Sequence, residues 1–561
     1  MIIKVKVKVK RTAEIHLMKK IITLWIVLLT VVFGYAQPPR IVNIVNFIRL
    51  LEPRDASITQ DVLYQTVVSQ VKLMRKHHLG GTFLLQYDAL MDPRYQKLLK
   101  TLPRDSFEIG AWWEIPQPLV ENAHMKWRGR YPWDWRANIG FSTGYTQQER
   151  VKLIDTYMHD FKNIFGYYPK SVASWFIDAF SLNYMYEKYH IVASANCKDQ
   201  YGTDGYTLWG GYWNQAYYPS KINAYMPAQH ADKQIPVPIF RMLGSDPIRQ
   251  YDDGLQQDRQ GVITLEPVYP KAGGSATWVE WFFKQFISGP SMAFAYTQAG
   301  QENSFTWKAM AKGLELQFPL IEKLRDENKI RVETLAASGQ WFKKNFKVTP
   351  ATSVTALEDL PGRHEKTVWF DSRFYRANLL WENNTLRIRD IHLFNEDMPS
   401  LYVDTPTTSN ECHLYTLPFV DGYLWSNKQQ RAGLGFKVVK NGKAVDMIGG
   451  DPVVSDQKKG ILTVAWPLKN TQGEIQIKFT EDKMEVAVVG NPQLDWQLNL
   501  NVPEPKRLPF TDITTQSVHA KFENISYGVT AKQGSFAKGG ENAVFSIHPN
   551  AKNKIVLVFD K

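Results

Sequence analysis

The chain has few cysteines and lacks the signatures of several cofactor sites. Only two of its 561 residues are cysteines, Cys197 and Cys412, and they lie far apart. This excludes a disulfide framework and a cysteine-rich zinc site, and it predicts two buried free thiols. The sequence contains no H-E-x-x-H motif, no P-loop and no dinucleotide-binding fingerprint, and its 12 histidines are scattered. We therefore expect no metal and no cofactor.

The chain also lacks a run of basic residues beyond its first 36 positions. Those positions hold seven of the 67 lysines and arginines but only one of the 55 acidic residues, so the formal net charge of +12 falls to +6 for the remainder. Nucleic-acid binding depends on clustered positive charge. The sequence therefore argues against a nucleic-acid partner. Its 44% hydrophobic and 22% charged residues are typical of a globular protein of two or three domains.

One long hydrophobic run is present, near the N-terminus. Residues 18–36 (MKKIITLWIVLLTVVFGYA) combine two lysines, an apolar stretch and small residues, the pattern of a secretory signal peptide. The apolar stretch is short for a membrane span. Residues 1–17 precede a complete signal and are interpreted as a misassigned start. We expect a bacterial protein exported to the periplasm or the extracellular space, with no stable membrane span after signal cleavage.

Between residues 38 and 347, short apolar segments alternate with charged, helix-like segments. The expected strands are Ile41–Arg49, Gly81–Tyr87, Phe107–Glu114, Val172–Asp178, His190–Cys197, Ile235–Leu243, Gly261–Glu266 and Ser291–Thr297. The expected helices are Ile58–His77, Thr146–Ile164, Asn183–Tyr189 and Lys308–Asn328. Thr146 and Glu149 match a capping box. This alternation predicts an α/β fold, a barrel of seven or eight parallel strands with crossover helices.

The C-terminal third follows a different pattern. Residues 348–366 contain threonine, proline and glycine and are expected to form a linker. From residue 367 to 561, short strands with alternating polarity are separated by turns of asparagine, aspartate and glycine. This spacing predicts an antiparallel β-sandwich domain that extends to the end of the chain.

Acidic residues stand at the ends of several expected barrel strands. In a parallel barrel these ends share one face, where catalytic groups lie. Asp178 ends the β-rich segment SVASWFID, Glu114 follows two tryptophans in an apolar setting that would raise its pKa, and Glu266 precedes a proline. A carboxylate and a carboxylic acid together can hydrolyse a glycosidic bond. We expect Asp178 as nucleophile or base and Glu114 or Glu266 as acid. Helix capping, for Asp178 above all, or loop salt bridges are the alternative.

Other residues near strand ends are candidates for substrate binding. Arg49 and Arg241 suit a carboxylate, a sulfate or sugar hydroxyls, or they form salt bridges with the acids. The remaining candidates are the acids Glu52, Asp88 and Asp204 and the aromatic residues Trp112, Trp113, Trp175, Trp209 and Trp213. The segments TLWGGYWNQAYYPS and MKWRGRYPWDW are interpreted as exposed loops whose rings stack on sugars; the alternative is that these rings belong to the core.

Three segments of the barrel region follow the motif order of a known superfamily. They are NFIR at Asn46–Arg49, GTFLL at Gly81–Leu85 and FEIGAWWEIP at Phe107–Pro116. Residues 38–340 thereby resemble the glycoside hydrolase/deacetylase (β/α)-barrel superfamily, which includes polysaccharide deacetylases and class II α-mannosidases. The resemblance implies a (β/α) barrel, and a β-sandwich after the barrel also fits this group.

The chain departs from the deacetylases at their metal site. The positions of two metal-binding histidines hold Trp112 and Pro116, and the aspartates of the first motif are replaced by Ile48 and Arg49. A zinc-dependent deacetylase needs such ligands. The segment WFIDAFSLN is instead similar to the mannosidase nucleophile motif W-x-I-D-P-F-G-H-S. That resemblance implies that Asp178 is the nucleophile.

These patterns predict an exported, metal-independent glycoside hydrolase that acts on an oligo- or polysaccharide. Two alternatives remain open. One is a non-catalytic glycan-binding barrel that has lost its metal and kept an aromatic cleft. The other is a divergent polysaccharide deacetylase with a different set of ligands.

Overall fold

The computed structural model describes residues 37–257, 259–539 and 543–559. The predicted start and signal segments, residues 1–36, lie outside this part. Contacts divide the chain into two units, Met1–Pro39 and Arg40–Lys561, and every helix and strand named below belongs to the second. None of the described helices combines the length and the apolar character that crossing a membrane requires.

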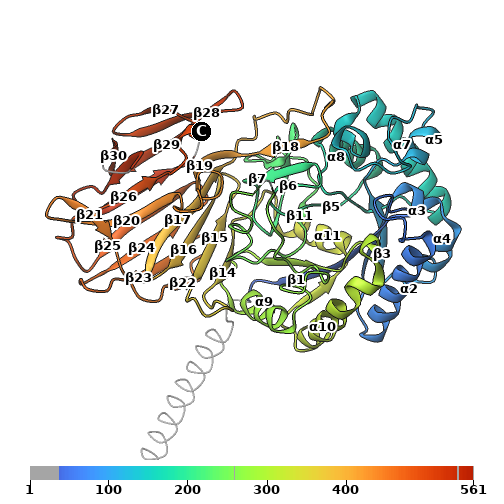
Figure 1. Ribbon diagram of the computed structural model, residues 1–561, viewed down its shortest axis with the longest axis horizontal. Helices are drawn as coiled ribbons and strands as arrows, with labels where there is room; N and C mark the ends of the chain where they lie inside the picture. The colour runs from blue at the N-terminus through green and yellow to red at the C-terminus, as the bar shows by residue number, and fades with distance from the viewer. Residues whose placement is uncertain (1–36, 258, 540–542, 560–561) are drawn as a thin grey trace, which may run out of the picture. The chain divides into compact units, whose positions relative to one another are not determined.

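Seven parallel strands form the wall of a barrel in the order β12–β1–β2–β3–β4–β5–β11. They are β1 (Arg40–Ile48), β2 (Gly81–Leu85), β3 (Phe107–Trp112), β4 (Ser171–Ala173), β5 (Ala193–Asn196), β11 (Ile239–Arg241) and β12 (Ala295–Ala299). Figure 1 shows the barrel region with its surrounding helices next to the β-rich C-terminal region. β8 (Ala216–Tyr217) pairs antiparallel with β11, and β13 (Arg331–Glu333) pairs with β1. β11 and β12, at the two ends of the parallel series, also contact each other, so the barrel is nearly closed.

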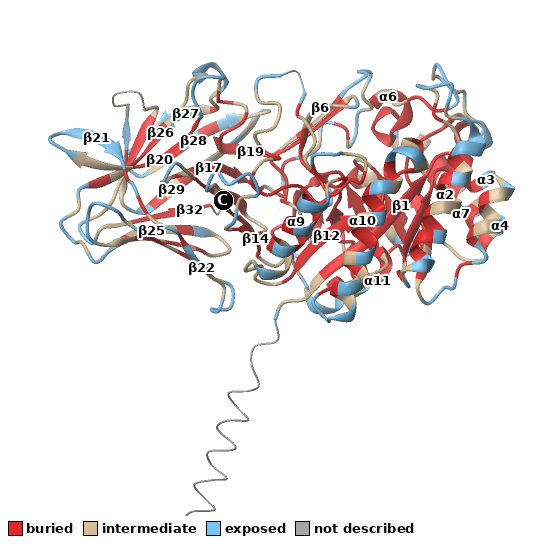
Figure 2. Cartoon of the chain, turned by 60° about the horizontal axis from the view of Figure 1, so that its bottom comes forward, coloured by how far each residue is buried: buried red, intermediate tan, exposed pale blue. Residues whose placement is uncertain are grey.

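The barrel strands are buried because helices cover their outer side. Residues 41–48 of β1 (IVNIVNFI) are all buried, as expected of a parallel strand covered on both faces. Figure 2 shows the buried strands inside a layer of helices whose outer sides are exposed. The longer helices are α2 (Gln60–Lys76), α7 (Gln147–Phe165), α8 (Ala179–Tyr189), α9 (Ala276–Ser288), α10 (Thr306–Asp326) and α11 (Leu335–Asn345). The shorter ones are α3 (Tyr87–Met91), α4 (Pro93–Leu99), α5 (Gln117–Asn122) and α6 (Ala137–Gly140).

The start of α7 confirms the predicted capping box. Thr146 Oγ1 accepts a hydrogen bond from the Glu149 amide, and the Glu149 carboxylate accepts one from the Thr146 amide at 2.7 Å. The two predicted free thiols are also present, since Cys197 and Cys412 are buried and unpaired.

Two expected strands differ in the structure. Gly261–Glu266 contains only an isolated bridge between Ser245 and Thr264, because its backbone amides bond to the preceding loop instead of to a neighbouring strand. The strand expected at Val172–Asp178 ends at Ala173, and the residues that follow leave the sheet. Both departures occur where the chain approaches the carboxyl end of the barrel.

The C-terminal region forms two antiparallel sheets of ten and eight strands. The ten-stranded sheet contains β14 (Thr352–Ala356), β15 (Lys366–Asp371), β16 (Tyr375–Glu382), β17 (Thr385–Leu393), β19 (Leu417–Asp421), β20 (Gly433–Lys440), β21 (Lys443–Asp446), β26 (Trp496–Asn501), β30 (Ser535–Lys538) and β31 (Phe545–His548). The eight-stranded sheet contains β22 (Val453–Ser455), β23 (Leu462–Pro467), β24 (Glu474–Phe479), β25 (Lys483–Val489), β27 (Phe510–Ile513), β28 (Ser517–Phe522), β29 (Ile525–Gln533) and β32 (Lys554–Val558). β14 lies inside the segment that the sequence suggested as a linker.

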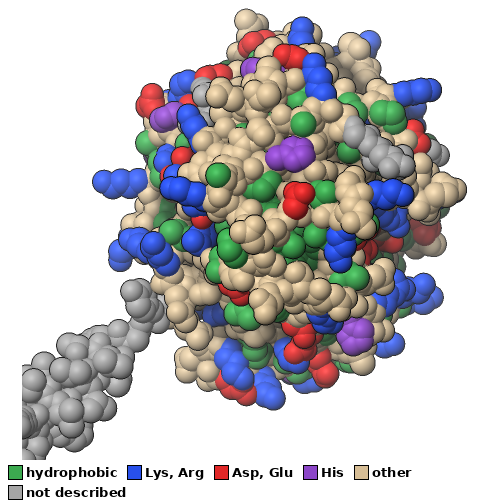
Figure 3. All heavy atoms as spheres, turned by 90° about the vertical axis from the view of Figure 1, so that its left-hand side faces the viewer, with side chains coloured by type: hydrophobic (Ala, Val, Ile, Leu, Met, Phe, Trp, Pro, Cys, Tyr) green, Lys and Arg blue, Asp and Glu red, His purple; other side chains and the backbone are tan. Residues whose placement is uncertain are grey.

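Alternating burial along the sandwich strands builds a core between the two sheets. In β24 (EIQIKF) every second residue is buried, as in a strand with one face toward a core and one toward solvent. On the face shown in Figure 3, basic and acidic side chains are interspersed.

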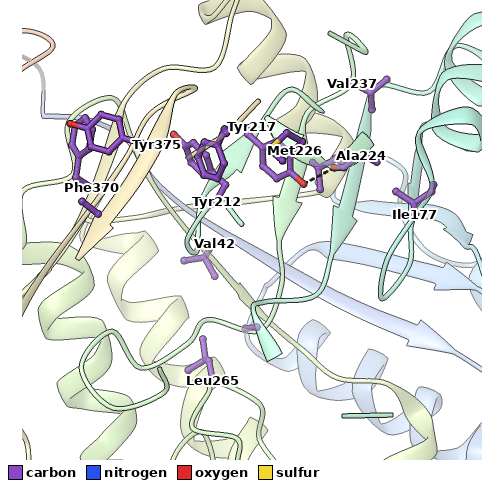
Figure 4. Close-up of a cluster of buried hydrophobic side chains, with 14 of the residues drawn as sticks. Val42, Ile177, Tyr212, Tyr217, Ala224, Met226, Val237, Leu265, Phe370 and Tyr375 are labelled. Atoms are coloured by element: carbon purple, nitrogen blue, oxygen red, sulfur yellow. Dashed lines mark hydrogen bonds between the residues drawn. The ribbon is translucent and has the colours of Figure 1, made fainter. Parts of the chain in front are cut away.

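The barrel and the sandwich share one hydrophobic core. Tyr212 and Tyr217 from the barrel and Phe370 and Tyr375 from the sandwich belong to the same cluster (Figure 4). The Tyr217 hydroxyl donates to the Ala224 carbonyl at 2.7 Å, which satisfies its polar end. A small sheet also joins the two regions, since β18 (Cys412–Tyr415) pairs in parallel with β7 (Tyr206–Trp209), which pairs with β6 (Gln200–Thr203).

Candidate active site

A cavity of about 600 Å³ lies at the carboxyl ends of the barrel strands, the face where barrel enzymes carry their active sites. Its wall includes residues from segments that follow six different strands, namely Arg49 after β1, Glu114 after β3, Trp175 after β4, Lys198 after β5, Leu243 after β11 and Glu302 after β12. Glu266, from the loop between β11 and α9, and Glu52, after β1, are further buried glutamates in the wall.

A buried arginine joins two of these glutamates. Arg49 Nη2 lies 2.6 Å from Glu114 Oε1, and Arg49 Nη1 lies 2.7 Å from Glu302 Oε2. The guanidinium carbon also lies 4.1 Å from the ring centroid of Trp133, in cation–π geometry. Burial lowers the pKa of Arg49, but the charges of Glu114 and Glu302 outweigh it and the net pKa is raised. Arg49 is therefore a permanent cation in the cavity wall.

Glu302 has an unusually high pKa for a carboxylic acid. Burial raises the pKa of Glu302 to about 7, although Arg49 opposes the shift, and the Ser304 hydroxyl donates a hydrogen bond to its Oε1 at 2.7 Å. Near neutral pH this side chain therefore exchanges between its protonated and ionised forms. A group with that property can donate or accept a proton.

Glu266 is held in place by two neutral donors. Gln301 Nε2 donates to its Oε1 at 3.0 Å, and Thr264 Oγ1 donates to its Oε2 at 2.7 Å. Burial raises the pKa of Glu266, whereas the two hydrogen bonds and the charge of Lys198 lower it. Gln301 Oε1 also accepts the backbone amide of Glu302 at 2.8 Å. One glutamine side chain thereby fixes both Glu266 and the backbone of Glu302.

Glu52 and Asp204, two of the predicted substrate-binding acids, also line the cavity. Arg54 donates to both oxygens of Glu52, at 2.7 and 2.6 Å. Although burial disfavours the charged form, the hydrogen bonds and the charge of Arg54 lower the pKa of Glu52. Asp204 is more exposed and lies 3.9 Å from Arg54. Glu52 is thus ionised under conditions in which Glu302 keeps a proton.

The tryptophans divide into two groups. Trp175, Trp133 and Trp135 line the cavity, so the segment MKWRGRYPWDW does supply rings to it. The Trp133 ring packs against the guanidinium of Arg49, whereas Trp175 and Trp135 are only half-buried.

The other four candidate tryptophans are buried, which corrects their placement in an exposed stacking loop or cleft. Trp112 stacks on Phe47 at 3.9 Å and Trp113 lies in the main core. Trp209 donates its indole N–H to Asp421 at 2.9 Å, and Trp213 stacks on Trp369 at 3.8 Å. The Gly-punctuated segment that holds Trp209 and Trp213 packs against the sandwich, a partner that local sequence does not reveal.

Asp178 lies outside the residues that line the cavity. It is the N-cap of α8, where its Oδ1 accepts the Ser181 amide and Arg150 Nη1 at 2.9 Å each, and its Oδ2 accepts the Ser142 hydroxyl at 2.5 Å. These are the contacts that the capping alternative describes. The role of Asp178 as a nucleophile remains a prediction.

Arg241 and Asp88 do not line the cavity either. Arg241 is buried in an ion pair with Asp199 at 2.7 Å, the salt-bridge alternative considered for it. Asp88 lies in α3, where burial raises its pKa to about 7 and its Oδ1 accepts the Ala89 amide at 2.7 Å. Both side chains are engaged inside the protein.

Several polar residues of the cavity were missed as candidates. They are Lys198, Gln200, Tyr206 and Gln260; Glu302, which follows an expected strand end, was not singled out for a role. The position of Lys198, just beyond an expected barrel strand, was the signal that could have identified it. Gln260 lies in an irregular loop whose path toward the cavity has no signature in the sequence.

The residues present do not fit the metal of the deacetylases. Ile48 and Trp112 are fully buried apolar side chains, Arg49 is a cation and Pro116 offers no side-chain donor. Within the described ranges, no group of three or more histidine, cysteine, aspartate or glutamate side chains is arranged to hold a metal ion. No catalytic step is therefore assigned to a metal here.

Comparisons with known proteins bear on the fold. Residues 138–347 match the family model of a domain of unknown function with a solved structure, DUF3863. No curated protein matches the sequence. A crystal structure from Parabacteroides distasonis, provisionally named a glycoside hydrolase/deacetylase, is similar to this chain with a TM-score of 0.51 and 14% identity, over 70% of this chain and 94% of that chain.

Two structures provisionally named polysaccharide deacetylases are also similar. The one from Mycobacterium smegmatis has a TM-score of 0.35 and 11% identity over 56% of this chain and 94% of that chain. The one from Pseudomonas aeruginosa PAO1 has a TM-score of 0.34 and 10% identity over 55% and 93%. The nearly closed barrel and the Parabacteroides distasonis structure confirm the predicted fold, a (β/α) barrel with a C-terminal region that fits a β-sandwich.

Proposed function

We propose that this protein is a carbohydrate-active enzyme, and specifically a glycoside hydrolase that needs no metal. One observation carries the proposal: a cavity at the carboxyl end of the barrel holds buried glutamates in unlike environments, beside tryptophan rings. Unlike environments separate the pKa values of two carboxyl groups, which is what acid–base hydrolysis of a glycosidic bond requires.

Glu302 is the proposed proton donor. With a pKa of about 7 it is still partly protonated at neutral pH, and it can give its proton to the glycosidic oxygen as the bond to the anomeric carbon breaks. The carboxylate that remains is stabilised by Arg49, whose Nη1 is 2.7 Å from Glu302 Oε2. Arg49 thus favours the product of this proton transfer.

Glu266 is the proposed base or nucleophile. Burial raises the pKa of Glu266 above its ordinary value, but two hydrogen bonds and the nearby charge of Lys198 oppose that shift and stabilise the carboxylate. As a carboxylate it can take a proton from an attacking water, or attack the anomeric carbon itself, while positive charge develops on the sugar ring. Trp175 offers an apolar ring for the sugar at the same cavity. Asp178 stays in the test as the nucleophile that the sequence predicted.

The test is release of reducing sugar from a panel of bacterial, plant and animal polysaccharides by protein that begins at Gln37. We expect release that persists in EDTA and falls by about 10²- to 10⁴-fold in Glu302→Gln and in Glu266→Gln. Glu121→Gln, an exposed change on α5, is the matched control and should have no effect. Glycan binding without release would favour the non-catalytic alternative, and acetate release that EDTA abolishes would favour a deacetylase.

We also propose export, on the basis of the signal-like residues 18–36. Expression of the full chain in a bacterium, followed by fractionation and N-terminal sequencing, tests it. Cleavage before Gln37 and recovery outside the cytoplasm are expected. An intact N-terminus in the cytoplasmic fraction would contradict the proposal.

A further inference from the structure

One wall of the cavity carries buried hydrogen-bond donors that lack acceptors. They come from Lys198, beyond the end of β5, and from Gln200 and Tyr206, in the strands β6 and β7 that follow. All three residues are at most 4% exposed, yet all three line the cavity. The chain has thus placed polar atoms at the cavity without satisfying them internally.

Lys198 is a buried cation without a bound carboxylate. Its Nζ donates to the Asp199 carbonyl at 3.0 Å, and no carboxylate of the described residues forms an ion pair with it. The carboxylate of Asp199 is taken by Arg241 and Arg376. Glu266 acts on Lys198 through its charge, but the two side chains are not joined. An ammonium group has three N–H donors, so two remain for a ligand.

Gln200 and Tyr206 add two more donors. Gln200 Oε1 accepts the Cys197 thiol at 3.1 Å, which leaves the amide nitrogen as a buried donor with no acceptor. The Tyr206 hydroxyl lies near the Cys197 sulfur, a weak acceptor, and makes no other hydrogen bond. A buried donor without an acceptor destabilises the folded protein. Donors kept in this state at a cavity wall are explained when a ligand supplies the acceptor.

We propose that Lys198, Gln200 and Tyr206 form a subsite for a negatively charged substituent of the sugar, so that the substrate is an acidic glycan. The inference deepens the proposed function and rests on it. A carboxylate or a sulfate group provides the oxygen acceptors that an ammonium, an amide and a phenol satisfy together. Trp175, whose ring lies 6.5 Å from that of Tyr206, gives the sugar ring an apolar surface beside these donors.

Among the buried cations of the described cavity wall, this role is left to Lys198; Arg259, which also lines the cavity, is exposed. Arg49 is held by Glu114 and Glu302, and Arg54 is held by Glu52. Burial lowers the pKa of Lys198, and an anion bound to its Nζ would reverse that effect by favouring the charged form.

The test compares matched pairs of glycans that differ only in charge. Uronate polysaccharides are compared with their carboxyl-reduced forms, and sulfated polysaccharides with their desulfated forms, by calorimetric titration of the protein that begins at Gln37. We expect at least tenfold tighter binding of the charged member in one of the two classes, which also identifies the group. Equal binding within every pair, or no binding of any charged glycan, would overturn the inference.

Variants then place the effect on this wall. Lys198→Met is expected to weaken binding of the charged glycan by about 10- to 100-fold, and Tyr206→Phe, which removes only the hydroxyl, by a smaller factor. Neither should change binding of the neutral member. Lys72→Met, an exposed change on α2, is the control. Unchanged charged-glycan binding in Lys198→Met would overturn the assignment; if that variant does not fold, Tyr206→Phe decides.

Turnover separates this inference from the proposed function. Charge-selective binding that depends on Lys198, with no sugar release from any glycan, would support the subsite and contradict the hydrolase. Sugar release that depends on Glu302 but is equal for the charged and the neutral member of each pair would support the hydrolase and contradict the subsite.

Discussion

Two regions of this protein contain the same buried motif, one arginine between two carboxylates, in different surroundings. At the junction of barrel and sandwich, Arg376 binds Asp199 and Asp390. In the cavity, Arg49 binds Glu114 and Glu302. All these side chains are at most 4% exposed. The motif alone therefore does not distinguish a structural region from a functional one.

The surroundings make the distinction. At the junction, Arg376 lies near the stacked rings of Trp213 and Trp369, and the Asp199 carboxylate accepts further hydrogen bonds from Tyr225 and Arg241. In the cavity, by contrast, Glu302 keeps a pKa of about 7 and lies in the wall of an open volume of about 600 Å³. A charge network enclosed by packed rings fixes the relation of two regions, whereas one that lines a cavity is available to a substrate.

The largest expected effect is on stability at the junction. Arg376→Met leaves Asp199 and Asp390 buried without their shared cation, which destabilises a protein by about 3–5 kcal/mol. Denaturant unfolding should show this loss. Lys284→Met, which removes one partner of an exposed pair with Glu358, is the control and should change stability by about 1 kcal/mol or less. A similar, small effect of both variants would mean that the junction network is not structural.

The cavity should respond in the opposite way. Glu302→Gln is expected to reduce kcat by about 10²- to 10⁴-fold, because the proton donor is lost. The free energy of unfolding should change by less than in Arg376→Met, because Arg49 keeps its ion pair with Glu114 and a neutral amide replaces a poorly solvated acid. Steady-state kinetics and unfolding on the same preparation measure both quantities. Loss of stability with retained activity would show that Glu302 has a structural role and not a catalytic one.

Asp178 tests the distinction between structural and catalytic carboxylates. In Asp178→Asn the asparagine can still cap α8 but has no negative charge to pair with Arg150. We therefore expect the free energy of unfolding to fall by about 1–3 kcal/mol. Activity should stay within a few-fold of that of the unsubstituted protein. Thr146→Ala, which removes another N-cap, is a control for capping alone at about 1 kcal/mol. A loss of activity by 10² or more in a stable Asp178→Asn protein would restore Asp178 as the nucleophile.

The architecture could be predicted from the sequence because it depends on local patterns. The apolar run of β1 and the capping box at Thr146 are readable without knowledge of any distant residue. Glu114, Glu266 and Trp175, which the sequence placed near strand ends, do line one cavity, although Glu266 reaches it from a loop and not from a strand.

What the sequence did not reveal depends on contacts between distant segments. Trp213 lies in a segment with the composition of an exposed aromatic loop. It is buried because Trp369, 156 positions later, stacks on it. Asp178 follows a strand end as a catalytic acid would, but Arg150 and the start of α8 engage it. The elevated pKa of Glu302 results from burial in the folded state, which no motif encodes.

The smallest expected effect is a shift in the pH dependence of activity when Arg49 is replaced. This shift is also the sharpest test of the Arg49 motif. Because Glu302 must be protonated, kcat/KM should fall about tenfold per pH unit above about pH 7. This basic limb of the pH profile should be absent from the residual activity of Glu302→Gln. The pKa of Glu302 in the folded protein lies above its ordinary value of 4.5, so the contribution of Glu302 to stability is present below pH 4.5 and is lost as the pH rises through about 7. Arg49 opposes the shift, so Arg49→Met should move the limb to higher pH. A limb that does not move would show that Arg49, like Arg376, serves only to hold its carboxylates in place.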